Sequence, residues 1–179
     1  MTQPAHQLGE LLQGMATPDA VSASAIITNL TLDSRTASAG SLFFGIPGGK
    51  TDGRQFVGQA LRSGATAALV EGRGWTESES KQNCYPIDGL RARIGHIASR
   101  FFGSPSHALC VVGVTGTNGK TTCATLLAQA LDLLGRKSGL IGTTGWGLAN
   151  DLQSSGLTTP DALTLQSRLA DLAAQGADS

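Results

Sequence analysis

The feature that most constrains this chain is a glycine-rich run at residues 112–122, Val-Gly-Val-Thr-Gly-Thr-Asn-Gly-Lys-Thr-Thr. The segment that leads into it, 109–114, is short, apolar and β-branched, which predicts a buried parallel strand. After Thr121, apolar side chains recur at helical spacing: Ala124, Leu126, Leu127, Ala130, Leu131 and Leu134. A strand, a glycine loop and a helix in this order predict a phosphate-binding loop, because the positive end of the helix faces the phosphates.

The residue types of this loop suit a nucleoside triphosphate. Gly116 and Gly119 allow a tight turn that brings backbone N–H groups close to phosphate oxygens. Lys120 supplies a point charge for the β- and γ-phosphates, and Thr121 supplies a hydroxyl for Mg²⁺. We therefore predict one catalytic residue, Lys120, one metal-binding residue, Thr121, and a nucleotide-binding set formed by Gly116, Thr117, Asn118, Gly119, Lys120, Thr121 and Thr122.

An ordinary loop is the alternative interpretation of the same run. The common P-loop pattern has a glycine five residues before Gly119, where this chain has Val114. In addition, 24 of the 179 residues are glycine, so a Gly-Lys-Thr triplet is a weak signal by itself. The order of strand, loop, Lys-Thr and helix favours nucleotide binding over a structural loop.

The run 115–122 resembles the ATP loop of the Mur ligases, which build the peptide of bacterial peptidoglycan. Valine is normal at position 114 in that family, so the departure from the general P-loop agrees with the resemblance. The related ligases that add glutamate to folate have a similar loop, with Gly-Ser after the lysine in place of Thr121 and Thr122.

Two further stretches carry the same resemblance. Leu32-Asp33-Ser34-Arg35, followed by 40–44 and 52–56, resembles the UDP-sugar-binding domain of the family. The stretch 158–166, Thr-Thr-Pro-Asp-Ala-Leu-Thr-Leu-Gln, resembles a segment of the Mur ligases that add the third peptide residue. The resemblance implies that Leu32 and Ser34 bind the uridine nucleotide, and that Thr158 and Thr159 bind the muramoyl peptide. Leu157 stands where the family often has asparagine.

The resemblance also implies an activity and its substrates. It indicates an ATP- and Mg²⁺-dependent amide ligase that adds meso-diaminopimelate or L-lysine to UDP-N-acetylmuramoyl-L-alanyl-D-glutamate through an acyl phosphate. Two alternatives remain open at this point. One is a different ligase of the superfamily, either dipeptide-adding or folylpolyglutamate-like, and the other is a non-catalytic nucleotide-binding module.

Breakers and periodicity predict an α/β chain with two domains. The first, 1–104, is expected to be a small α/β domain that binds the UDP-sugar. It would contain strands at 26–33, 41–46, 65–70 and 84–87 and helices at 6–15, 55–63 and 90–102. The second, 105–179, is expected to be part of a P-loop domain with a parallel sheet. It would contain strands at 109–114 and 138–141, the helix after Thr121, and a helix with Thr159 as N-cap and Pro160 at its first position.

The second domain supplies too few strands for a complete P-loop sheet. From His107 onward we expect about two strands, whereas sheets usually have ~5–6. We therefore expect an N-terminal fragment of the ligase that is inactive alone. In the family, the glutamate that helps hold Mg²⁺, a carbamylated lysine and the domain that binds the amino acid all come later in the chain.

Composition gives no reason to expect nucleic acid or a membrane as a partner. The net charge is zero, which gives no reason to expect nucleic acid. No apolar stretch approaches the length of a membrane span. Three widely spaced cysteines, Cys84, Cys110 and Cys123, are typical of reduced, mostly buried thiols, so we expect a cytoplasmic protein. We also expect the full-length protein to be a monomer.

Overall fold

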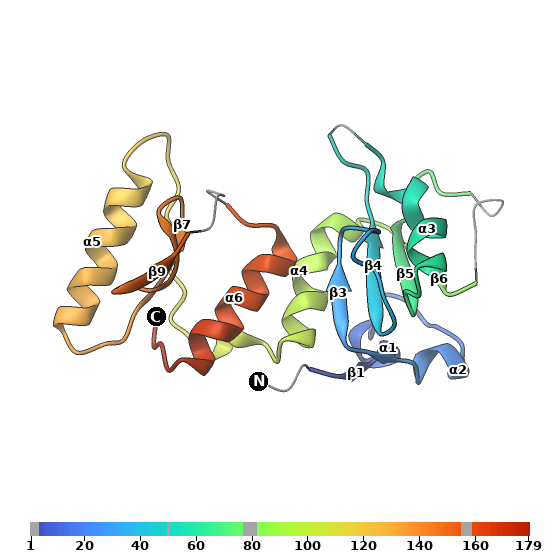
Figure 1. The fold of residues 1–179 in the computed structure, drawn as a ribbon, viewed down its shortest axis with the longest axis horizontal. Coiled ribbons are helices and arrows are strands. Elements are labelled where there is room, and N and C mark those ends of the chain that lie inside the picture. Colours follow the sequence, from blue (N-terminus) through green and yellow to red (C-terminus); the bar gives the residue numbers. More distant parts are fainter. Residues whose placement is uncertain (1–3, 50, 77–81, 155–158) are drawn as a thin grey trace. The chain divides into compact units, whose positions relative to one another are not determined.

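Two structural units make up the chain, Met1–Phe101 and Phe102–Ser179, as traced in Figure 1. The structure is a computed structural model and describes residues 4–49, 51–76, 82–154 and 159–179.

A parallel sheet of four strands organises the first unit (Figure 1). Its strands are β3 (Asn29–Thr31), β4 (Ser41–Gly45), β5 (Ala67–Glu71) and β6 (Cys84–Ile87), in that spatial order. Every residue of β4 is buried, as expected for a central parallel strand with both faces covered. The predicted α/β class is confirmed, and so are strands close to those expected at 41–46, 65–70 and 84–87.

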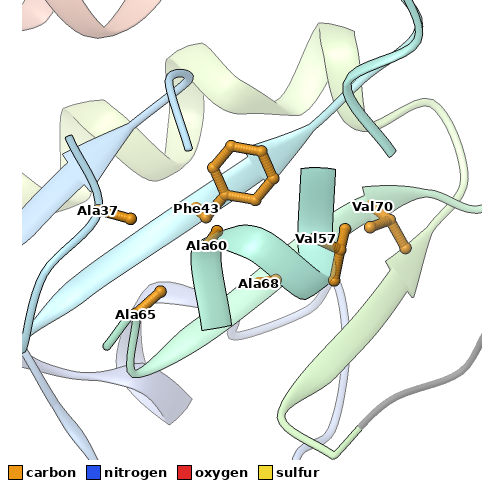
Figure 2. Packing of buried hydrophobic residues seen from close by; sticks show 7 residues of the cluster. All are labelled: Ala37, Phe43, Val57, Ala60, Ala65, Ala68 and Val70. Atoms are coloured by element: carbon orange, nitrogen blue, oxygen red, sulfur yellow. The ribbon is translucent and has the colours of Figure 1, made fainter. Parts of the chain in front are cut away.

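Two helical segments enclose this sheet. The 3₁₀ helix η1 (Gly53–Phe56) leads into α3 (Val57–Arg62), and α4 (Leu90–Phe101) follows β6. Figure 2 shows the apolar cluster beneath α3, in which Val57 and Ala60 meet side chains from β4 and β5: Phe43, Ala68 and Val70, with Ala37 and Ala65 at the margin. The spacing of apolar residues in 90–102 predicted α4 correctly, because its buried residues lie at helical intervals: Leu90, Ile94, Ile97, Ala98 and Phe101.

The N-terminal segment differs from the single helix predicted at 6–15. It forms a short strand, β1 (His6–Gln7), and one helical turn, α1 (Leu8–Leu11). β1 pairs antiparallel with β2 (Ile26–Ile27), and α2 (Ala20–Ala23) lies between them in sequence. The strand predicted at 26–33 is therefore divided, because β2 pairs with β1 while β3 pairs with β4 in another sheet.

The second unit contains helix α5 (Lys120–Leu133) and an antiparallel sheet of β7 (Gly139–Gly142), β8 (Gly145–Leu148) and β9 (Asp151–Gln153). A short 3₁₀ helix, η3 (Pro105–His107), precedes them, and α6 (Ala162–Ala174) follows. The predicted strand near 138–141 is present as β7. Its described neighbours are antiparallel, so the prediction of a parallel sheet in this unit was wrong for the described residues.

The strand predicted at 109–114 is not formed. Val111 and Val112 are 55% and 56% exposed, and the segment has no regular secondary structure. The physical reason is pairing: among the described residues, no strand runs beside this segment to complete a ladder. One contact fixes its start, where the Cys110 N–H donates to the Asp178 carbonyl at 2.9 Å.

Helix α6 begins two residues later than predicted. Its N-cap is Asp161 rather than Thr159, since the Asp161 carboxylate accepts from the N–H groups of Leu163 and Thr164 at 2.9 and 3.0 Å. A carboxylate that accepts two hydrogen bonds satisfies the first helical N–H groups better than the expected threonine would. None of the described helices is both long and apolar enough to cross a membrane.

Candidate functional site

The glycine loop places the N-terminus of α5 in an open position. Gly119 is the N-cap, with a φ of 76°, and its lack of a side chain leaves the first N–H groups of the helix without a side-chain acceptor. Gly116 has a φ of 148°, a conformation that L side chains rarely adopt. The loop 111–119 is exposed along its whole length. Unsatisfied N–H groups at an accessible helix N-terminus are a suitable binding site for a phosphate group.

Lys120 already directs its ammonium group over this loop. Its Nζ donates to the Gly116 carbonyl at 2.5 Å and lies 3.4 Å from the Thr117 carbonyl. The side chain is therefore folded back toward the loop and does not extend into solvent. This arrangement places a positive charge beside the helix N-terminus, where anionic oxygens would be attracted by both.

A pocket of about 380 Å³ in the second unit brings several predicted residues together. Lys120 and Thr121 line it, and so does Thr159 from the start of the α6 region. Thr158 lies outside the described residues. The other predicted nucleotide-binding residues are on the loop and the first turn of α5 without lining the pocket: Gly116, Thr117, Asn118, Gly119 and Thr122.

Two residues of this pocket were not predicted from the sequence. Thr143 and Thr144 connect β7 to β8 and line the same pocket as Lys120. The available signal was a pair of hydroxyl residues just after the strand predicted at 138–141. In α/β proteins, ligands bind outside the carboxyl ends of strands, so hydroxyl groups at this position are candidate ligand contacts.

Most of the remaining pocket wall is apolar. It is formed by side chains of the 109–114 segment, α5, β7 and α6, among them Leu109, Leu131, Leu140 and Leu169. Its polar lining residues come from several elements: Lys120 and Thr121 of α5, Thr143 and Thr144 of the turn, Thr159, Ser138 and Ser179.

A hydrogen-bond network fixes α5 against the sheet of the second unit. The Asp132 carboxylate accepts from the N–H and hydroxyl of Ser138, at 3.0 and 2.6 Å, and from the side-chain amide of Asn150 at 3.0 Å. The hydrogen bond from the Ser138 hydroxyl is the main cause that lowers the pKa of Asp132. Because Ser138 directly precedes β7, this network sets the position of the strand that leads to the 143–144 turn.

The predicted uridine-binding residues lie in the first unit, after β3. Ser34 is buried, and its hydroxyl donates to the Gln59 side-chain carbonyl at 3.2 Å, while Leu32 is half-buried. Arg35 forms a close ion pair with Asp33, with Arg35 Nη2 2.6 Å from the carboxylate. Hydrogen bonds from the Arg35 side chain lower the pKa of Asp33 from 3.8 to about 2. The ion pair within the turn and the hydrogen bond to Gln59 thus both restrain its conformation.

Other potential ligand groups are dispersed. The described part of the chain contains no cluster of three or more His, Cys, Asp or Glu side chains able to hold a metal. Cys84 is half-buried, but Cys110 and Cys123 are exposed, so the expectation of mostly buried thiols was wrong. Both lie in parts of the second unit where the apolar surface is uncovered.

Comparison with known protein families assigns both units to one family. Residues 26–102 match the model described as "Mur ligase family, catalytic domain", and residues 114–179 match the "Mur ligase middle domain". The chain belongs to the Mur ligase family. The matched ranges contain the Ser34 turn and the glycine loop respectively.

Relatives of this Mur ligase chain carry a consistent name. It is 50% identical over 153 residues to a Pseudomonas putida protein named UDP-N-acetylmuramoyl-L-alanyl-D-glutamate–2,6-diaminopimelate ligase, a match that covers 85% of this chain and 31% of the relative. A Xanthomonas oryzae pv. oryzae protein of the same name is 44% identical over 172 residues, 96% of this chain and 34% of the relative. The chain therefore spans about a third of the length of the curated relatives it matches.

Solved structures agree with this assignment. A structure titled with the same ligase name has a TM-score of 0.75 and 30% identity, covering 97% of this Mur ligase chain and 35% of that chain. A MurF structure from Acinetobacter baumannii has a TM-score of 0.58 at 21% identity over 96% of this chain and 34% of that chain, and shares the fold.

Proposed function

We propose that this chain forms the nucleotide-binding part of an ATP-dependent ligase that adds 2,6-diaminopimelate to UDP-N-acetylmuramoyl-L-alanyl-D-glutamate in the cytoplasm. The observation that carries the proposal is the glycine loop that ends in Lys120 and Thr121 at the open N-terminus of α5. That loop lies in a region matched to the Mur ligase middle domain, in a chain whose relatives carry this ligase name.

The residues of the loop have different roles in binding the nucleotide. The backbone of 116–119 and the first N–H groups of α5 bind the phosphates, with Thr117, Asn118 and Thr122 beside them. Lys120 stabilises the negative charge that spreads over the β- and γ-phosphates in the transition state. Its present contact with the Gly116 carbonyl shows that the ammonium reaches the loop without a change in the backbone.

Thr121 is the residue of this chain suited to Mg²⁺. Its side chain is exposed on the first turn of α5 and lines the pocket, so its hydroxyl is accessible to a hard cation that prefers oxygen ligands. When bound, Mg²⁺ would neutralise charge on the β- and γ-phosphates.

The proposed reaction has two steps. A carboxylate oxygen of the glutamate forms a bond to the γ-phosphorus, the bond from that phosphorus to the β–γ bridging oxygen breaks, and ADP leaves with the electron pair. The amine then attacks the acyl carbon, phosphate leaves with the electrons of the C–O bond, and the amine loses a proton. Positioning and cationic groups supply most of the catalysis in such a transfer.

The sequence resemblance assigns residues to two parts of the acceptor substrate. We assign the uridine nucleotide to Leu32 and Ser34, and the muramoyl peptide to Thr158 and Thr159. The support for Ser34 is its fixed geometry in a turn that ends β3 at the carboxyl edge of a parallel sheet. Thr159 is supported by its place in the same pocket as Lys120.

Calorimetric titration of the 179-residue chain tests this function. We expect binding of ATP with Mg²⁺, and of UDP-N-acetylmuramoyl-L-alanyl-D-glutamate in preference to the nucleotide that already carries the third residue. A preference for the longer nucleotide would indicate a dipeptide-adding ligase. Binding of folate in place of the sugar nucleotide, or of no nucleotide at all, would contradict the proposal.

A further inference from the structure

The turn between β7 and β8 has an unusual composition for a tight hairpin. Gly142 pairs with Gly145, so Thr143 and Thr144 alone make the connection. Two-residue hairpin turns favour Gly or Asn, because the preferred types require a positive φ at one or both positions. Neither threonine has a positive φ. Two β-branched residues therefore occupy a turn whose local chemistry favours other residues.

The flanking glycines make this turn possible. Gly145 has a φ of 143°, and a Cβ atom there would lie 2.5 Å from the Gln153 carbonyl oxygen. The unusual backbone conformation is thus taken by a neighbour, which leaves the threonines in ordinary conformations. Departures from local sequence rules of this kind are expected where function requires a particular side chain.

The hydroxyl groups of the turn are available to a ligand. Both threonines are exposed, and both line the pocket that Lys120 and Thr121 also line. No described residue forms a hydrogen bond with either hydroxyl. Each can therefore donate one hydrogen bond to an anionic oxygen without breaking an existing contact.

The position of the turn identifies the part of the substrate that it would contact. The pocket is lined by Lys120 and Thr121 from the nucleotide side and by Thr159 from the segment assigned to the muramoyl peptide. In the proposed reaction, the group that passes from the nucleotide to the peptide carboxylate is the γ-phosphoryl group. Its oxygens gain hydrogen-bond donors from groups already fixed in place, an arrangement that favours transfer.

We propose that Thr143 and Thr144 bind the γ-phosphoryl group of ATP through their hydroxyls and hold it for transfer. This inference rests on the proposed ligase function and adds two residues to its site. Uncharged donors complement Lys120 here, because they fix the direction of the oxygens whereas the ammonium supplies charge.

Titration of the 179-residue chain with two nucleotides tests the inference. The probes are ADP and an ATP analogue with an imido group between the β- and γ-phosphorus atoms, each with Mg²⁺. We expect Thr143→Val, Thr144→Val, or both, to weaken binding of the analogue by roughly ten-fold, the loss typical of one hydrogen bond to a charged group, and to leave ADP binding unchanged. Thr→Ser at the sensitive position should restore binding of the analogue.

Thr125→Val is the matched control, because it makes the same chemical change on α5 at a residue outside the pocket lining. Circular dichroism on each variant checks that the second unit remains folded. If the wild-type chain binds both nucleotides and neither turn variant lowers affinity for the analogue, the inference is wrong while the ligase proposal stands. If the wild-type chain binds neither nucleotide, both are overturned.

Discussion

Lys120 is the residue on which the proposed nucleotide site depends most. Its Nζ lies 2.5 Å from the Gly116 carbonyl oxygen, beside helical N–H groups that have no side-chain acceptor. Backbone donors can bind phosphate without it, but the charge on the ammonium strengthens every phosphate contact near it. The side chain is half-buried at the loop and contributes little to either apolar core.

We predict that Lys120→Ala weakens binding of MgATP to the chain by roughly ten-fold or more, the effect of losing a charge-assisted hydrogen bond. The fold should persist, because the side chain contacts the exposed loop. Calorimetric titration measures the affinity. Lys137→Ala is the matched control, since Lys137 lies in the same unit and outside the pocket lining. Equal affinities for wild type and Lys120→Ala would remove the phosphate-binding role.

The Asp33–Arg35 pair gives a second test at this scale. Hydrogen bonds from Arg35 hold the pKa of Asp33 at about 2 in the folded state, below the ordinary value of 3.8. A depressed folded-state pKa stabilises the fold above the unfolded-state value, and this contribution is lost as the pH falls through the folded-state pKa. Asp33→Asn should therefore lower the free energy of unfolding near neutral pH, and the difference from wild type should shrink between pH 3.8 and about 2. Urea unfolding of both proteins across this range measures it. A difference that is constant with pH would show that the ionised carboxylate contributes nothing.

At the scale of elements, the N-cap of α6 is the clearest case. Asp161 accepts hydrogen bonds from the N–H groups of Leu163 and Thr164, and its carboxylate also accepts from the Thr164 hydroxyl at 2.7 Å. Burial raises the pKa of Asp161, but the hydrogen bonds from Thr164 and Leu163 outweigh it, so the net shift is downward. The carboxylate is therefore ionised near neutral pH and suited to a helix N-terminus.

We predict that Asp161→Ala destabilises α6 by about 1 kcal/mol, the usual cost of losing an N-cap. Hydrogen exchange should accelerate at the amides of Leu163 and Thr164, which mass spectrometry of peptides from this region can follow. Thr159→Ala should leave these exchange rates unchanged, because Thr159 makes no cap contact. The opposite pattern would restore Thr159 as the N-cap.

The sequence predicted elements well where local pattern and tertiary pairing agree. Helix α4 was predicted because its apolar residues follow the helical period, and strand β4 because it is a short, mostly apolar run; both lie in the core of the first unit. The segment 109–114 has an equally strong strand composition, yet it is irregular because no described strand pairs with it. Composition reports preference for a strand, whereas pairing depends on residues distant in sequence.

In the candidate site, too, residues specified by a local motif were predicted and residues brought together by the tertiary structure were not. The loop and Lys120 were predictable because a short contiguous motif specifies a local conformation and its chemistry. Thr143 and Thr144 were not predicted, because their importance arises only when the hairpin brings them to the pocket lined by Lys120. The sequence predicted Thr159 as the N-cap because threonine before proline suits a helix start, whereas the hydrogen bonds of the structure assign the cap to Asp161, two residues later.

At the scale of the whole molecule, the first unit has the features of an independently stable domain. Its sheet is parallel, its central strand is fully buried, and an apolar cluster lies beneath α3 (Figure 2). Arg100 at the end of α4 donates to the carbonyls of Leu11 and Gln13 at 2.9 and 2.8 Å, which closes the N-terminal segment onto the unit. The apolar cluster and the Arg100 hydrogen bonds therefore both join residues of the same unit.

We predict that residues 1–104 expressed alone fold and retain weak affinity for UDP-N-acetylmuramoyl-L-alanyl-D-glutamate. Circular dichroism reports the fold, and calorimetric titration reports the affinity. Ser34→Ala in the same fragment should weaken binding further, since it removes the buried hydroxyl that donates to Gln59. A well-folded fragment with no affinity would place the uridine site elsewhere.

The second unit differs in its surface. Leu126 and Leu133 of α5 and its C-cap Leu134 are 60%, 89% and 78% exposed. Large apolar side chains grouped on one helix favour association, because contact between two such surfaces removes them from water. A few such contacts are worth several kcal/mol at the usual transfer free energy of about 25 cal/mol per Å².

The final prediction follows from this surface. The 179-residue chain should self-associate as its concentration rises, as measured by light scattering, and Leu133→Glu combined with Leu134→Glu should shift it toward the monomer by placing charges on the exposed side of α5. Val21→Glu is the matched control, because Val21 is 82% exposed in the first unit and belongs to a different surface. Association that is unchanged by the α5 variant but abolished by the control would assign the contact to the first unit. A chain that stays monomeric at every concentration would show that the exposed leucines of α5 do not drive association.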